Sequence, residues 1–172
     1  VTIGSHSHTH RHLAKLSIEE LEEEIELSNQ IFLKELGRIP SLFAYPYGET
    51  DEKIFDLLKK YKYKVAFGQH SGVINETSNL YYLPRFSLNE RYGDIERVQF
   101  ASQTKGLGVY DFIPSNPHIT DNPPFIGFSL LDEKLAAKID CFIFDEDGSV
   151  PSDIFKFNER IEIRLKRSLA PG

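Results

Sequence analysis

The sequence of 172 residues contains no methionine and only one cysteine, Cys141. A single cysteine cannot form a disulfide within the chain, so the fold does not depend on an oxidising compartment. No apolar run is long enough to span a bilayer, and the N-terminus lacks the pattern of a signal peptide. Because the chain starts at Val1 without a methionine, we expect it to be a segment of a longer protein.

Clusters of basic residues are also missing, and the formal net charge is −6. This balance argues against nucleic acid or an anionic membrane as the main partner. Hydrophobic residues make up 40% of the chain, including 13 Phe and 8 Tyr. The composition therefore predicts a soluble globular protein with a sizeable core.

The first two thirds of the chain alternate between helical and strand-like patterns. The clearest helix should begin after Ser17, which forms a capping box with Glu20, and should end at Gly37. Helices are predicted at residues 18–36, 51–61 and 92–102, and strands at residues 1–7, 41–46, 63–68 and 81–88. Such alternation with short loops indicates an α/β fold built from parallel βα units.

The pattern changes after Lys105. Residues 113–124 hold four prolines and indicate a linker, and strand-like stretches follow at residues 125–131, 138–144 and 160–166. Clean alternation in the last of these is typical of antiparallel β structure. We therefore expect three parts: a first domain over residues 1–112, a linker over 113–124, and the start of a β-sandwich accessory domain over 125–172.

Four histidines occupy every second position within "GSHSHTHRHL", residues 4–13. In a strand all four would point the same way, whereas a helical turn would pair His6 with His10 and His8 with His12. Two imidazoles at this i, i+4 spacing can converge on one metal ion, and histidine favours Zn, Co, Ni or Fe. The cluster therefore favours a metal site over a polar loop, although two histidines leave the ligand set incomplete.

The same stretch resembles the histidine motif of NodB-type polysaccharide deacetylases (carbohydrate esterase family 4), with His6 and His10 at the positions of the metal ligands. "FAYPYGE", residues 43–49, is similar to the next motif of the family, an aromatic-Pro-aromatic-Gly loop that lines the substrate groove. "YKYKVAFG" and "YLPRFSL" resemble the strand regions that follow, especially in the subgroup acting on polymers like poly-N-acetylglucosamine. The resemblance covers residues 1–105.

The resemblance implies a distorted, incomplete (β/α) barrel with its site at the carboxyl ends of the strands. It also implies removal of N-acetyl groups from an amino-sugar polymer or oligosaccharide, which could be of poly-N-acetylglucosamine, chitin or peptidoglycan type. The family's divalent metal, usually zinc, polarises the acetyl carbonyl and lowers the pKa of a water molecule. An extracellular, periplasmic or cell-envelope location is expected. The implied substrate-binding residues are Tyr45, Pro46, Tyr47 and Gly48, and the backbone N–H of Tyr47 is the implied oxyanion donor.

Three parts of the family pattern have no match in this chain. Two adjacent aspartates, one a base and one a metal ligand, precede the histidine motif in the family and would lie before Val1. The Arg before the aromatic loop is out of register, and Arg85 is a plausible substitute. The C-terminal Leu-His motif is absent, so His70 could be the general acid or could contact substrate. These departures leave a rival function open, a carbohydrate-binding protein that has lost its catalytic activity.

Overall fold

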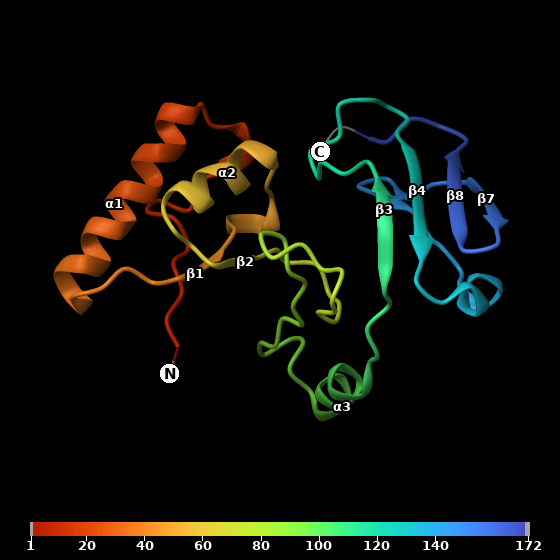
Figure 1. Cartoon of the computed structure of the whole chain (residues 1–172), viewed down its shortest axis with the longest axis horizontal. Helices are drawn as coiled ribbons and strands as arrows, with labels where there is room; N and C mark the ends of the chain where they lie inside the picture. The colour runs from red at the N-terminus through yellow and green to blue at the C-terminus, as the bar shows by residue number, and fades with distance from the viewer. Residues whose placement is uncertain (1, 171–172) are drawn as a thin grey trace. The chain divides into compact units, whose positions relative to one another are not determined.

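The computed structural model describes residues 2–170 and divides the chain into two compact units, residues 1–106 and 107–172 (Figure 1). The predicted boundary at residue 112 differs, because residues 109–113 form a strand of the second unit. Val1, Pro171 and Gly172, at the ends of the predicted domains, lie outside the described residues. Within residues 2–170, no helix is both long and apolar enough to cross a lipid bilayer.

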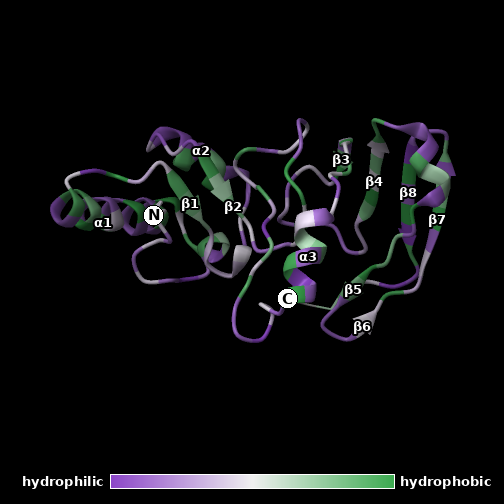
Figure 2. Ribbon diagram, turned by 90° about the horizontal axis from the view of Figure 1, so that it is seen from below, coloured by the Kyte–Doolittle hydropathy of each residue, from purple (hydrophilic) through white to green (hydrophobic). Residues whose placement is uncertain are grey.

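The first unit is an α/β structure. Its elements are η1 (Leu13–Lys15), α1 (Ile18–Leu36), β1 (Leu42–Ala44), η2 (Pro46–Gly48), α2 (Glu52–Lys60), β2 (Val65–Phe67) and α3 (Ile95–Gln103). Helix α1 has the predicted bounds: Ser17 and Glu20 form the capping box, and Gly37 closes the helix with φ = +67°. Figure 2 shows apolar and polar stretches alternating along α1, as expected of an amphipathic helix.

Four short segments of the first unit run parallel. β1 pairs with β2, Ser5 forms a parallel bridge to Phe43 on one side, and Leu83 forms one to Phe67 on the other. The predicted strand at 81–88 is thus reduced to a single bridge. The described residues form no closed barrel, and this partial α/β arrangement agrees with the coarser expectation of an incomplete one.

The core of the first unit lies between these parallel segments and the helices. Its fully buried side chains include Leu13, Leu21, Ile25, Phe43, Tyr45, Ile54, Leu58 and Tyr63. They come from η1, α1, β1 and the residue that follows it, α2 and the segment before β2, so burial of apolar area joins these early elements. This packing fixes where each loop leaves the parallel segments.

The second unit contains a four-stranded antiparallel sheet in the order β3–β4–β8–β7. Its elements are β3 (Val109–Ile113), β4 (Phe125–Leu130), η3 (Glu133–Lys138), β5 (Phe144–Asp145), β6 (Gly148–Ser149), β7 (Ser152–Phe157) and β8 (Arg160–Leu165). Most of the predicted strand at 138–144 is loop, because η3 ends at Lys138 and β5 begins only at Phe144. The antiparallel β structure agrees with the sequence, while the β-sandwich stays a prediction.

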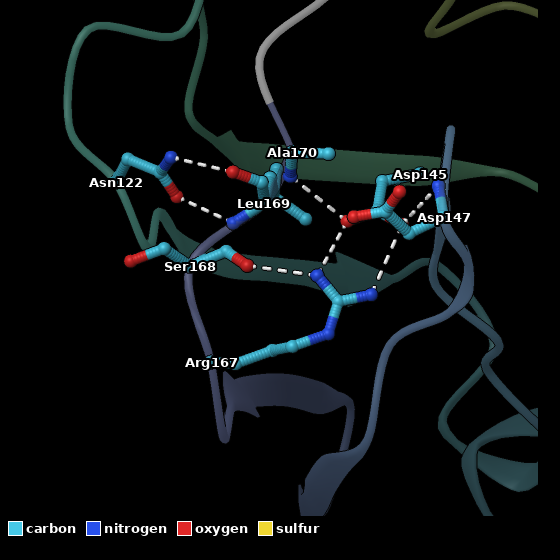
Figure 3. Close-up of polar contacts among 7 residues, drawn as sticks. All are labelled: Asn122, Asp145, Asp147, Arg167, Ser168, Leu169 and Ala170. Carbon is cyan, nitrogen blue, oxygen red and sulfur yellow. Dashed lines mark hydrogen bonds and ion pairs between the residues drawn. The ribbon is translucent and has the colours of Figure 1, made fainter.

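An ion pair ties the segment after β8 to the β5–β6 hairpin (Figure 3). The guanidinium of Arg167 contacts both carboxylate oxygens of Asp145, at 2.6 and 3.0 Å, and the backbone N–H of Ala170 donates to the same carboxylate. Arg167 is the main reason that the pKa of Asp145 is well below its usual range. Asn122 adds two hydrogen bonds to the backbone of Leu169, which fixes the end of the described chain.

Candidate active site

The residues singled out by the sequence lie at one edge of the parallel segments. His6 follows Ser5, the Tyr45–Gly48 loop follows β1, and His70 follows β2 by three residues. Parallel neighbours end at the same edge of a sheet, which is where sites form in α/β folds. The topology therefore explains how three separate stretches of sequence contribute to one region.

His6 is oriented by a backbone carbonyl. Its Nδ1 lies 2.7 Å from the carbonyl oxygen of Ala44, the last residue of β1. A carbonyl can only accept, so Nδ1 carries a proton, and in the neutral ring the lone pair is then on Nε2. A neutral imidazole held in this tautomer is the form that ligates metals.

His10 completes the pair. The rings of His6 and His10 approach edge to face with centroids 4.8 Å apart, and both side chains are exposed. The backbone N–H of His10 donates to the hydroxyl of Ser7, and both residues adopt left-handed backbone conformations, with φ of +61° and +63°. The pair therefore comes from a tight loop and not from a regular helix or strand.

Glu24, in the middle of α1, holds this loop. Its carboxylate accepts hydrogen bonds from the backbone N–H groups of His8 and Thr9 and from the hydroxyl of Thr9. Burial alone would raise the pKa of Glu24, but these hydrogen bonds bring it below its usual value. Glu24 is not among the site residues predicted from the sequence. The signal was its place beside Leu21 and Ile25 on the apolar stripe, where an acidic residue needs a partner.

The loop after β1 separates its two tyrosines. Tyr45 is 1% exposed, packs against Phe43 and donates its hydroxyl to the carbonyl of Tyr81, so its ring offers no face to a sugar. This corrects the expectation that Tyr45 binds substrate. Pro46 and Gly48 are also buried and shape the loop without exposing a side chain.

Tyr47 instead projects outward. The residue is 49% exposed, and its ring meets the His10 ring with centroids 4.8 Å apart and stacks on the His12 ring with centroids 4.0 Å apart. The Nδ1 of His12 lies 2.8 Å from a carboxylate oxygen of Glu49, which holds the stacked imidazole. The structure thus joins the histidine motif and the aromatic loop into one exposed aromatic cluster, defined by His6, His10, His12 and Tyr47.

Backbone strain is concentrated here. Tyr47 has φ = +58°, so three of the six described non-glycine residues with positive φ belong to the two motifs. Such conformations cost energy and persist where surrounding contacts impose them, commonly at functional sites. Gly48 has φ = +75°, and a Cβ there would lie 2.7 Å from the backbone nitrogen of Gln69, so only glycine fits.

His70 and Arg85 lie together beyond β2. The backbone N–H of Arg85 donates to the carbonyl of His70, and its guanidinium donates to the Gly68 carbonyl and the Ser87 hydroxyl. The His70 ring contacts that of Tyr82 at 4.6 Å, and burial lowers the pKa of His70. A lowered pKa leaves the imidazole neutral at pH 7, which suits substrate contact better than proton donation.

A metal would have two imidazole ligands in this part of the chain. Among residues 2–170, no three His, Cys, Asp or Glu side chains are grouped closely enough to hold an ion together. His6 and His10 nevertheless fit a metal, because the carbonyl of Ala44 fixes the His6 tautomer and the two rings are adjacent.

Comparison with known proteins agrees with the motifs. Residues 1–66 match the family model for polysaccharide deacetylase. The structure is similar to that of Streptococcus pyogenes deacetylase PplD in complex with acetate, with a TM-score of 0.54 and 19% sequence identity. The match covers 59% of this chain and 44% of that protein, so this chain corresponds to less than half of it. No curated protein matches significantly.

At 19% identity the structural similarity shows a shared fold only. The family match is independent of it and includes the whole of the exposed aromatic cluster. The resemblance inferred from the two motifs is therefore confirmed. Residues 1–66, which build the histidine pair and the Tyr45–Gly48 loop, are the part of the chain that matches the polysaccharide deacetylase family model.

Proposed function

We propose that this chain is the substrate-facing part of a metal-dependent hydrolase that removes N-acetyl groups from an amino-sugar polymer or oligosaccharide. One observation carries the proposal: His6, in the tautomer set by Ala44, lies against His10 at the carboxyl edge of parallel segments. The family match over residues 1–66 supports the reaction class. Poly-N-acetylglucosamine, chitin-like and peptidoglycan-type polymers are the candidate substrates.

In this proposal His6 and His10 hold a divalent ion, and zinc is our choice because both ligands are imidazoles. When bound, the ion would supply a Lewis acid for the acetyl carbonyl. Tyr47 presents an exposed ring beside the pair and offers an apolar surface for a sugar ring. Its backbone N–H is the proposed donor to the oxyanion.

His70 and Arg85 take supporting roles. They lie on the loops that follow β2 and Leu83, and a hydrogen bond between their backbones joins the two loops. Both loops leave the same edge as the histidine pair. We propose that His70 contacts the substrate and that Arg85 fixes the course of these loops through the Gly68 carbonyl. The proposed location is extracellular, periplasmic or at the cell envelope, in keeping with a polysaccharide substrate.

The test is acetate release by the full-length protein from chitin oligomers and from poly-N-acetylglucosamine, with added Zn²⁺. His6→Ala and His10→Ala should each lower kcat/KM at least about a hundredfold, because each removes a proposed ligand. His8→Ala is the matched control: it is a neighbouring exposed histidine and should retain wild-type activity.

Two results would contradict the proposal. Wild-type activity in His6→Ala would refute the ligand assignment. Binding of the oligomers by the wild-type protein without any acetate release would favour a carbohydrate-binding protein without catalytic activity.

A further inference from the structure

Helix α1 carries three buried polar side chains, and two of them, Glu24 and Ser28, lie one turn apart on the face that packs inward. Glu24 is 5% exposed and Ser28 is 4% exposed, among apolar neighbours such as Leu21 and Ile25. Buried polar groups are costly unless they are hydrogen-bonded, so their partners identify what they do.

Both side chains bind the loop that carries the histidine pair. The hydroxyl of Ser28 lies 3.0 Å from that of Ser5. One carboxylate oxygen of Glu24 accepts from the backbone N–H groups of His8, at 3.0 Å, and Thr9, at 2.9 Å. The other oxygen accepts from the Thr9 hydroxyl.

The positions of these contacts in the sequence are informative. Ser5 immediately precedes His6, and Thr9 immediately precedes His10. The backbone adopts a left-handed conformation at Ser7, between the two anchors, and again at His10, directly after the second anchor. A loop with such conformations needs outside contacts to keep one shape, and α1 provides them at both ends.

We propose that Glu24 is a positioning residue that, with Ser28, fixes the histidine loop so that the rings of His6 and His10 stay adjacent. The consequence for metal binding rests on the proposed function, whereas the consequence for loop order does not. Glu24 acts through hydrogen bonds to the backbone that carries the two rings.

The contacts indicate that the shape of the Glu24 side chain matters more than its charge. A glutamine could accept both backbone N–H groups with its amide oxygen and donate its amide nitrogen to the Thr9 hydroxyl oxygen. An alanine could make none of these bonds. Glu24→Gln should therefore rescue what Glu24→Ala loses.

The experiment uses two measurements on Glu24→Ala, Glu24→Gln and the control Glu23→Ala, which removes an exposed glutamate from the adjacent position of α1. Hydrogen exchange at the His8 and Thr9 amides should be at least about tenfold faster in Glu24→Ala. Titration with Co²⁺, followed by its visible absorption, should show an affinity lower by about tenfold to a hundredfold. Glu24→Gln should stay within about threefold of wild type in both measurements, and Glu23→Ala should match wild type.

Unchanged exchange at His8 and Thr9 in Glu24→Ala would overturn the inference, as would faster exchange with an unchanged Co²⁺ affinity. If Glu24→Ala does not fold, Thr9→Val is the alternative, because it removes one of the three hydrogen bonds and should also accelerate amide exchange at His8 and Thr9. Exchange at the wild-type rate in Thr9→Val would overturn the inference as well. A wild-type protein that binds no Co²⁺ would contradict the proposed function alone, because exchange tests the positioning role by itself.

Discussion

The ring of Tyr47 lies parallel to the ring of His12, with an interplanar angle of 5° and centroids 4.0 Å apart. The two residues come from different motifs, and the carboxylate of Glu49 holds the imidazole through Nδ1. One face of the Tyr47 ring is thus covered by His12, and its exposed area is presented beside the histidine pair.

Removing the imidazole should weaken substrate binding. In His12→Ala the Tyr47 ring loses its stacking partner, and such aromatic contacts contribute about 0.5–1.5 kcal/mol. We expect KM for N-acetylglucosamine oligomers to rise about threefold to tenfold while kcat changes less. Steady-state kinetics measures both, with His8→Ala as the control; a loss in kcat alone would contradict a role through Tyr47.

Tyr45→Phe should affect stability and not substrate binding. The substitution removes the hydrogen bond to the Tyr81 carbonyl within the core, a loss of about 1 kcal/mol of unfolding free energy in the first unit. Urea unfolding measures this loss, and KM should stay at the wild-type value because the ring is buried. A raised KM with unchanged stability would restore Tyr45 to the substrate surface.

The second unit should lose stability in acid through Asp145. The Arg167 guanidinium lowers the pKa of the folded carboxyl below its ordinary 3.8, so its stabilising effect is fully present above pH 3.8. As the pH falls below 3.8 the unfolded chain takes up the proton first, and the effect is lost on approach to the folded pKa. Melting curves recorded from pH 5 to pH 2 should show a smaller acid-induced fall in melting temperature for Asp145→Asn than for the wild type. The stability of this variant is already reduced at neutral pH. Asp153→Asn, which breaks an exposed ion pair with Lys166, should behave like wild type.

His70 should titrate below its ordinary pKa of 6.5, because burial disfavours the charged ring. The unfolded chain therefore takes up this proton first as the pH falls through 6.5, and the contribution of His70 to stability declines there. NMR of the ring Cε1–H signal against pH measures the titration, with His70→Gln assigning the resonance. A midpoint above 6.5 would indicate a nearby anion and would support proton donation to substrate.

Local signals explain why part of the fold was predictable. The bounds of α1 follow from Ser17, Glu20 and Gly37, which act within one turn of the helix ends. The strand β8 (Arg160–Leu165) was predictable from its alternation, because one face packs in the core of the second unit. The strand predicted at 138–144 was mostly wrong, because an apolar run alone does not distinguish a strand from a loop.

The part of the candidate site that was predictable from the sequence is the part in which both contacting residues belong to one motif. The adjacency of His6 and His10 agrees with the pair chosen from the motif, although a loop and not a helix provides it. The roles of Tyr45 and Glu24 depended on which side of an element faces the core, and that is decided by distant partners such as Tyr81 and Thr9. Sequence spacing alone does not contain that information.

The tight approach of Gly48 to Gln69 links two loops that are separated in the sequence. Any side chain at position 48 would collide with the backbone of the loop after β2, so that loop would have to take another course. Among related proteins, we expect replacements of this glycine to be inherited together with changes in length or sequence at positions 68–70. The two loops should therefore evolve as one unit, and transplanting either one alone into a relative should fail.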